Sequence, residues 1–355
     1  MTTKARRAGI VGTGLIGGSI GLALRRQGWH VTGEDRDPVR SARALELGAL
    51  DAVGTDKDAE ITFLATPVRA VAEAARQALA ATSGVVTDVG SVKASIVADV
   101  DHPRFVGGHP MAGSELEGVD GADPDLFAGA VWVLTPTAST DDDAYASLRA
   151  VVSDLGGDVV ALTPEHHDAL VAVVSHVPHL TAAALMDLAD GKATEHRALL
   201  RLAAGGFRDM TRIAAGHPGI WPDICGENRG AIVEVLDGLL ASLGSVRDIV
   251  AGNDRDGLLA VLERARAARV NLPSRMVRPA GLAELRLPVP DRPGVLAEVT
   301  TLAGATDVNI ADLEIAHSSE GDRGVLILLV EAAAVERLRS GLVELGYRPS
   351  VSPLD

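Results

Sequence analysis

The chain of 355 residues, 47% of them hydrophobic and 3% aromatic, has room for about two to three domains with cores of Ala, Val, Leu and Ile. Its formal net charge of −15 at pH 7 argues against nucleic acid or an anionic membrane as a partner, and no uninterrupted apolar run of about 20 residues is present to span a bilayer. The single cysteine, Cys225, excludes an internal disulfide and a cysteine zinc site and favours a reducing, cytoplasmic location.

A glycine-rich loop follows the first apolar segment of the chain, in the run AGIVGTGLIGGS. Gly12 permits a tight turn, Gly14 lets the backbone approach a pyrophosphate, and Gly17 lets the next helix pack on a sheet while its N-terminal N–H groups face the anion. The basic residues before this run resemble the start of a signal peptide. However, the glycine content and the lack of a small-residue cleavage site favour a dinucleotide-binding loop.

A carboxylate after the second strand-like run indicates that the dinucleotide is NAD. Asp35 follows the run 30–33 at the spacing where such a residue accepts the ribose hydroxyls. It would repel the 2′-phosphate of NADP, although Arg36 beside it could offset part of that repulsion. Further cofactor contacts are expected from the glycine loop and from the loop after the strand at 61–65, namely Leu15, Ile16, Thr66 and Pro67.

Short apolar strands alternate with helical runs from residue 8 to about 165, which predicts a doubly wound parallel α/β sheet of the Rossmann type. The predicted strands are 9–12, 30–33, 61–65, 84–88, 104–107 and 130–134, with a late one at 159–162. From about residue 164 to 270 the pattern changes to long helices, and the runs 165–188 and 230–243 are apolar nearly all round. We expect both to be deeply buried, and so short a chain needs a homodimer to cover them.

The C-terminal region begins with the segment 271–281, whose two prolines and lack of periodicity are typical of a linker. Beyond it the pattern follows a β-α-β-β-α-β order, which is the ferredoxin-like arrangement. The predicted organisation is a dinucleotide-binding domain at 1–165, an all-α domain at 166–270, the linker, and a small domain at 282–355.

Two polar clusters lie in loops of the predicted sheet, where a substrate would meet the nicotinamide. In TDVGSVK, Ser91 could cap a helix or hydrogen-bond a substrate hydroxyl. In GGHPMAGSE, His109 lies between two glycines and a proline, and a histidine so constrained is suited to general base catalysis near neutral pH. The alternative for His109 is that it caps a turn.

Two further clusters lie in the helical region. In SHVPH, Pro178 should kink the helix, and His176 and His179 share one face. The pair could bind zinc, but no third ligand with metal spacing is near, so we expect no metal and keep core histidines as the alternative. In GGFRDMTR an Arg with a neighbouring Asp suits carboxylate recognition, and Trp221 nearby suggests a wall for a ring-shaped ligand. An interhelical ion pair with a core indole is the other interpretation.

Taken together, these motifs closely resemble the prephenate/arogenate dehydrogenase family of tyrosine biosynthesis. GTGLIGGS, TDVGSVK, GGHPMAGSE, SHVPH and GGFRDMTRIA with IWPDICGEN match it in order and spacing over roughly residues 8–270. The tail run DRPGVL, with Asn309 and Ile310, looks like an ACT domain, a type that typically binds regulatory amino acids.

The resemblance implies NAD-dependent oxidative decarboxylation of prephenate to 4-hydroxyphenylpyruvate. His109 would accept the proton of the C4 hydroxyl as hydride leaves C4 for NAD+, Ser91 would hydrogen-bond the same hydroxyl, and Arg212 would hold the ring carboxylate that departs as CO2. The remaining substrate-side residues are expected to be Ser175, His176, His179, Trp221 and, at the rim or gate of the pocket, Glu115.

Other functions compete with this one. Arogenate would replace prephenate if Glu115, Glu117 or Asp120 paired with its ammonium group. β-Hydroxyacid dehydrogenases also join a Rossmann domain to a helical one but use a helical-domain lysine, and here Lys192 at a helix end is the only lysine after Lys93. A non-catalytic sensor of NAD and an amino acid is the third possibility.

The tail is expected to bind tyrosine or another amino acid at the start of its first helix, where N–H groups can take a carboxylate, or else to serve only in assembly. The residues expected there are Asp291, Gly294, Val295, Leu296, Asn309 and Ile310.

Overall fold

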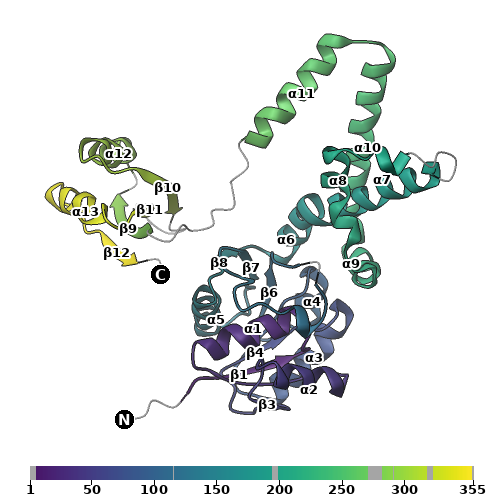
Figure 1. Ribbon diagram of the computed structural model, residues 1–355. Helices are drawn as coiled ribbons and strands as arrows, with labels where there is room; N and C mark the ends of the chain where they lie inside the picture. The colour runs from purple at the N-terminus through teal and green to yellow at the C-terminus, as the bar shows by residue number, and fades with distance from the viewer. Residues whose placement is uncertain are drawn as a thin grey trace. The chain divides into compact units, whose positions relative to one another are not determined.

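The computed structural model describes residues 5–114, 116–193, 199–270, 282–290, 292–317 and 323–353. The chain forms two compact units, residues 1–272 and 273–355 (Figure 1). The predicted linker at 271–281 and the site residues Glu115 and Asp291 lie outside the described residues.

An eight-stranded sheet forms the centre of the first part of the chain, with the strand order β3-β2-β1-β4-β5-β6-β7-β8. The strands β1 to β6 run parallel, as the alternation of short apolar runs predicted. Their bounds, with those of the last two strands, are β1 (Arg7–Val11), β2 (His30–Glu34), β3 (Ala52–Val53), β4 (Ile61–Leu64), β5 (Val85–Asp88), β6 (Phe105–Pro110), β7 (Val131–Thr135) and β8 (Asp158–Ala161).

One pairing departs from a purely parallel sheet, because β7 runs antiparallel to β6 and parallel to β8. Between β6 and β7 the described residues form a loop with one short 3₁₀ turn, η1 (Val119–Gly121), instead of a crossover helix. A parallel return needs such a crossover, so β7 comes back in the opposite direction.

The helices of the α/β part follow the predicted alternation, and their starts agree with local sequence signals. The N-cap residue Asp37 accepts a hydrogen bond from the Val39 N–H, and Asp141 accepts one from the Ala144 N–H. The bounds are α1 (Leu15–Arg26), α2 (Pro38–Glu46), α3 (Val68–Ala81), α4 (Ala94–Asp99) and α5 (Asp142–Asp154).

The second part of the first unit is helical, as predicted. The expected helix at 165–188 is a continuous run of α6 (Pro164–Val171), the π turn η2 (Ala172–His176) and α7 (Val177–Ala193). Pro178 lacks the N–H that an α-helical turn requires, and a π turn stands just before it. The remaining elements are η3 (Leu199–Leu202), α8 (Gly205–Thr211), η4 (Arg212–Ala215), η5 (Pro218–Ile220), α9 (Trp221–Glu227), α10 (Arg229–Ala251) and α11 (Arg255–Val270).

The apolar helices are not deeply buried within one chain, contrary to expectation. On α10, Leu240 is 64% exposed and Val250 is 59% exposed. The run Pro164–Lys192 is long and apolar enough to cross a bilayer by length and composition, with an 18-residue window of mean hydropathy 1.6, of which 28% is buried. The expectation from uninterrupted apolar runs, that nothing in the chain spans a bilayer, did not anticipate this helix, which still meets a measure of length and mean hydropathy. Its buried His167 and Asp168 contact the α/β part, as in a core helix of a folded domain.

The second unit has the predicted β-α-β-β-α-β order around a four-stranded antiparallel sheet, with the strand order β10-β11-β9-β12. Leu285 and Leu287 of β9, Leu328 of β11 and Leu338 of the second helix are fully buried in its core. The elements are β9 (Leu282–Pro290), α12 (Val295–Ala305), β10 (Ile310–His317), β11 (Arg323–Glu331), α13 (Val335–Glu344) and β12 (Ser350–Pro353).

The two glycines of the turn between β1 and α1 should differ in what they tolerate. Gly12 has φ +94°, and a Cβ there would lie 2.3 Å from the Ala65 carbonyl oxygen, whereas a Cβ at Gly14 meets nothing within 4 Å. We expect Gly12→Ala to lower the free energy of unfolding by about 2 kcal/mol or more, and Gly14→Ala by about 0.5 kcal/mol. Urea denaturation of both variants tests this, and equal losses would contradict it.

Candidate active site

His109 lies near the end of β6, and the two glycines before it allow this strand to pack closely against its neighbours β5 and β7. A Cβ at Gly107 would lie 2.4 Å from Thr135 Oγ1, and one at Gly108 would lie 2.7 Å from the Asp88 carbonyl oxygen. With no side chain in the way, the Gly108 N–H donates to Asp88 Oδ1 at 3.1 Å. The glycines of GGHP therefore hold His109 at a fixed, buried position beside β5 and β7.

His109 is the first member of a buried chain of three side chains. Its Nδ1 lies 2.8 Å from His167 Nε2, and His167 Nδ1 lies 2.7 Å from Asp168 Oδ1. A carboxylate can only accept, so His167 carries its proton on Nδ1 and its Nε2 accepts from His109 Nδ1–H. This assignment leaves the lone pair of His109 on Nε2, which is the arrangement of a general base. The alternative that His109 caps a turn is wrong.

The environment lowers the pKa of two histidines of the site, His109 and His176. Burial lowers the pKa of His109 well below its usual value, and the neighbouring His167, Lys93 and His176 lower it further. Burial also lowers the pKa of His176 to about 4, against a smaller opposing effect of Asp168. A neutral imidazole is the form of His109 that can accept a proton.

Asp168 also supplies the cap of α4, which the sequence analysis had considered as a role for Ser91. Its Oδ1 accepts the Lys93 N–H at 2.8 Å and its Oδ2 accepts the Ala94 N–H at 2.9 Å. The capping interpretation of Ser91 is therefore wrong, because a carboxylate from α6 already takes those N–H groups. Ser91 is half-buried in the loop just before them, and its hydroxyl pairs with none of the described residues.

A buried ion pair holds the same loop against the sheet. The Lys93 ammonium donates to Asp88 Oδ2, and both side chains are completely buried. Asp88 Oδ2 also accepts the Gly90 N–H at 2.8 Å. Burial lowers the pKa of Lys93, and the Asp88 carboxylate opposes that shift. Removing either partner would leave an uncompensated charge beside His109.

The predicted histidines and tryptophan of the helical part come together. Trp221 stacks on His179 with ring centroids 3.7 Å apart and an interplanar angle of 16°, and it meets His176 edge-on at 6.2 Å. Ser175 is half-buried in the π turn beside His176. Within the described ranges no group of three or more His, Cys, Asp or Glu side chains could hold a metal ion.

Arg212 begins the 3₁₀ turn η4, which packs against α7, and its side chain is exposed. The carboxylates considered for an ammonium group lie differently. Asp120 binds Arg43 of α2 at 2.7 Å on the surface, while Glu117 is exposed in the loop after β6.

The glycine loop has the features that a bound dinucleotide requires. The N-terminus of α1 has no side-chain cap and no acidic residue in its first turn, and the space beside Gly14 is open. The hydroxyls of Thr13 and Thr66 are buried without a partner among the described residues. Asp35 is half-buried after β2, where its Oδ2 accepts the Thr13 N–H at 2.9 Å. These donors and acceptors fit a dinucleotide.

The remaining predicted cofactor residues lie around this loop. Leu15 and Ile16 form the first turn of α1 and are half-buried, Arg36 is exposed after Asp35, and Pro67 is the N-cap of α3. All of them follow the carboxyl ends of β1, β2 or β4, which is where ligands bind in such sheets.

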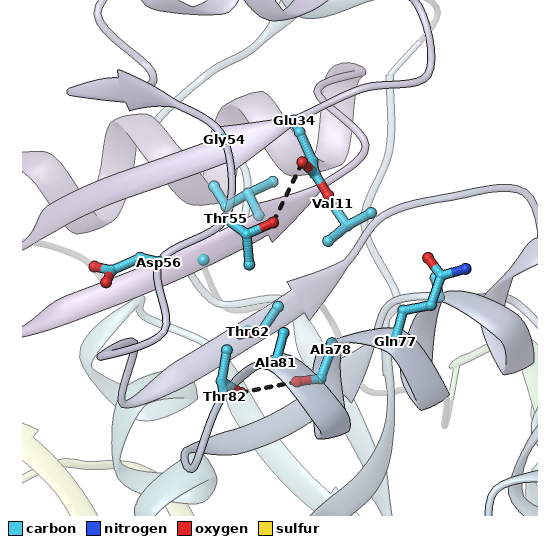
Figure 2. A pocket seen from close by; sticks show the side chains of 13 residues that line it. Val11, Glu34, Gly54, Thr55, Asp56, Thr62, Gln77, Ala78, Ala81 and Thr82 are labelled. Atoms are coloured by element: carbon cyan, nitrogen blue, oxygen red, sulfur yellow. Dashed lines mark hydrogen bonds between the residues drawn. The ribbon is translucent and has the colours of Figure 1, made fainter.

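A cavity of about 150 Å³ lies elsewhere on the same sheet, between β1, β4 and α3. Figure 2 shows Glu34, Thr62 and Gln77 among its walls, with Thr55 donating to Glu34 Oε2 at 3.3 Å. Its lining includes Gly9, Ile10 and Val11 of β1 but none of the predicted site residues, so we place the active site at His109.

Sequence reasoning missed His167 and Asp168, and it gave no role to Asn228 or Lys93. The pair His167-Asp168 interrupts an otherwise apolar helical run, which is a signal that was available. Nothing local connects that pair to His109, which lies 58 residues earlier in the sequence than His167.

Comparison with known proteins finds two family models that match this chain. The family model described as "Prephenate dehydrogenase, nucleotide-binding domain" matches residues 20–161, and the model "Prephenate dehydrogenase, dimerization domain" matches residues 163–264. A prephenate dehydrogenase of Bacillus subtilis is 34% identical over 336 residues, covering 89% of this chain and 90% of that protein.

Solved structures of a prephenate dehydrogenase and an arogenate dehydrogenase are also similar to this chain. The Aquifex aeolicus prephenate dehydrogenase in complex with hydroxyphenyl propionate and NAD+ superposes with a TM-score of 0.71 at 34% identity, covering 77% of this chain and 100% of that one. The Synechocystis arogenate dehydrogenase gives 0.65 at 32% identity, covering 74% and 99%.

The stability of the protein should depend on pH through His176. Its pKa is about 4 when folded and 6.5 ordinarily, so the unfolded chain binds more protons between these values. The contribution of the neutral ring is complete above pH 6.5 and is lost as the pH falls toward 4. We expect His176→Gln to reduce the slope of unfolding free energy against pH by up to about 1.4 kcal/mol per pH unit. Denaturant titrations at several pH values test this, with His166→Gln as control, and an unchanged slope would contradict it.

Proposed function

Because the chain belongs to the prephenate dehydrogenase family, we propose that it oxidises and decarboxylates prephenate to 4-hydroxyphenylpyruvate with NAD+. The observation that carries this proposal is the buried chain from His109 through His167 to Asp168, which leaves His109 Nε2 as a base. The reaction needs a base and correct orientation and no metal, because aromatisation of the ring drives the loss of CO2.

His109 takes the proton of the C4 hydroxyl on Nε2. NAD+, held at the glycine loop by residues that include Thr13, Thr66 and Asp35, supplies the hydride acceptor. As His109 becomes positively charged, His167 and the Asp168 carboxylate behind it stabilise the charge. Burial favours return of the proton, because it lowers the pKa of His109.

Ser91 hydrogen-bonds the same C4 hydroxyl and orients it toward His109. Its loop is held by Asp168 on one side and by the Asp88–Lys93 pair on the other. Asp168 therefore positions the base His109, through His167, and also the loop that carries Ser91.

The other substrate contacts come from the helical part. Arg212 holds the ring carboxylate, and Ser175, His176, His179 and Trp221 line the pocket, with Glu115 at its rim. The stacked rings of His179 and Trp221 support this, since they offer a flat surface to a six-membered ring. Prephenate is preferred to arogenate, and the engagement of Asp120 by Arg43 removes one candidate partner for an ammonium group.

The enzyme acts as a homodimer in the cytoplasm. The exposed leucines and valines of α10 and α11 support a partner chain there, and the matched dimerization-domain model covers both helices up to residue 264. The partner copy would cover apolar surface that one chain leaves exposed.

The second unit is an ACT domain that binds an amino acid, tyrosine first among them. Its β-α-β-β-α-β order supports this, as does the left-handed Gly294 at the uncapped start of α12, where N–H groups are available. The side chain of Val295 is in the core, so only its N–H can serve, while Leu296 and Asn309 are exposed and Ile310 is half-buried. The similarity to the Bacillus subtilis enzyme covers 89% of this chain and so extends into this unit.

The purified chain should form NADH and 4-hydroxyphenylpyruvate from prephenate and NAD+, with a lower kcat/KM for arogenate.

His109→Ala should lower kcat by about 10²–10⁴-fold, since the base is lost, with a much smaller change in NAD+ affinity. Steady-state kinetics measure both, and His166→Ala, an exposed histidine of α6, is the control. Activity on simple hydroxyacids alone would refute the proposed function, and unchanged turnover would remove His109 from the mechanism.

A chain truncated near Arg278 tests the role of the second unit. We expect it to stay active, because all proposed catalytic residues lie in the first unit, and to lose inhibition by tyrosine. Initial rates with and without tyrosine, compared with the full chain, measure this. Inhibition as strong as in the full chain would place tyrosine at the active site and refute a regulatory role of the tail.

A further inference from the structure

One buried ring nitrogen beside the candidate active site has no hydrogen-bond partner among the described residues. His176 is 1% exposed in the π turn η2, and its Nε2 is buried without a hydrogen-bond partner among the described residues. A buried donor left unpaired is costly, so native proteins rarely retain one without a use for it. The question is whether Nε2 carries the proton or the lone pair.

Asn228 answers that question. Its Nδ2 lies 2.8 Å from the backbone carbonyl oxygen of Asp168 and 3.2 Å from His176 Nδ1. Turning the amide over would bring two acceptor oxygens together at the carbonyl of Asp168, so the NH2 group faces both neighbours. It donates one hydrogen to each, and His176 Nδ1 must therefore be an acceptor. The proton of a neutral His176 is consequently on Nε2.

The ring is neutral under working conditions, because burial lowers the pKa of His176 to about 4. It is close enough to His109 that a positive charge on His176 would lower the pKa of that base, and it meets the Trp221 ring edge-on. The unpaired N–H of His176 therefore lies in the same group of side chains as the base His109 and the ring of Trp221.

We infer that Asn228 holds His176 in the tautomer with its proton on Nε2, and that this N–H donates a hydrogen bond to an oxygen of the bound substrate. The inference rests on the proposed function, since prephenate offers two carboxylates, a keto group and a hydroxyl as acceptors. Asn228 is then a positioning residue, and His176 contributes to specificity by favouring an oxygen over an ammonium group at that point.

The tautomer is measured directly by nitrogen-15 NMR of histidine rings in the full-length enzyme, with His176 assigned by its loss in His176→Gln. We expect the signal of a neutral ring protonated on Nε2. In Asn228→Asp the new carboxylate accepts from Nδ1–H, so the proton should move to Nδ1. A wild-type His176 protonated on Nδ1 would overturn the inference, whatever the activity.

Kinetics test the contact with substrate. His176→Phe keeps the ring but removes the donor, so the KM for prephenate should rise on the order of tenfold with a smaller change in kcat. His176→Gln, whose amide nitrogen can take the place of Nε2, should recover most of that loss. A structural role alone would not produce this recovery. Asn228→Asp should raise KM as His176→Phe does, and His166→Gln is the control.

Comparing KM for prephenate with KM for arogenate identifies the substrate oxygen that accepts the hydrogen bond from His176. A rise in KM for prephenate but not for arogenate places it on the keto group, and an equal rise places it on a carboxylate or the hydroxyl, which both substrates carry. An unchanged KM in a folded His176→Phe enzyme would overturn the contact with substrate, and so would a KM in His176→Gln that rises as far as in His176→Phe. A wild-type enzyme inert toward both substrates would refute the proposed function instead, while the NMR result would still decide the tautomer.

Discussion

The carboxylate of Asp168 is the interaction on which the rest of the site depends. It accepts the first N–H groups of α4 across the boundary between the sheet and the helices, and it faces the ring of His167. A charged acceptor at a helix N-terminus is stabilising because of the helix dipole and the unpaired N–H groups there. The same residue offers its backbone carbonyl to Asn228. Asp168 thus fixes the loop of Ser91 and the tautomer of His109 through its side chain and, through its backbone carbonyl and Asn228, the tautomer of His176.

This arrangement concentrates polar groups in a buried place, where each must have a partner. The Asp88–Lys93 pair is completely buried, and Asp88 also takes the N–H groups of Gly90 and Gly108. Such a pair contributes little net stability, because desolvation offsets most of the attraction, but it specifies one conformation by making alternatives costly. Rigidity of this kind suits a reaction whose main requirements are orientation and one well-placed base.

The helical part has the opposite character, because much of its apolar surface is exposed in the single chain. Leu240 and Leu243 of α10 and Leu262 of α11 are each more than half exposed. Apolar patches of this kind occur at protein interfaces, which agrees with the match to a dimerization-domain model. The second unit needs no such cover for its core, since its sheet and two helices enclose a cluster of buried leucines and valines.

Much of this protein could be predicted from its sequence, wherever the signal is local. The Gly12–Gly17 turn, the alternation of strands and helices and the β-α-β-β-α-β order of the tail depend on periodicity and on backbone freedom within a few residues. His109 could be singled out because glycines and a proline constrain it in the sequence itself.

Only the tertiary structure decided how the site is completed. Asp168 caps a helix that starts 74 residues earlier, so the nearby Ser91 was a reasonable but wrong candidate for the cap. The antiparallel direction of β7 depends on whether its connection forms a crossover helix, which strand patterns do not report. The tautomers of three histidines depend on which acceptor each ring meets, and hydrogen bonds between distant segments leave no trace in local sequence.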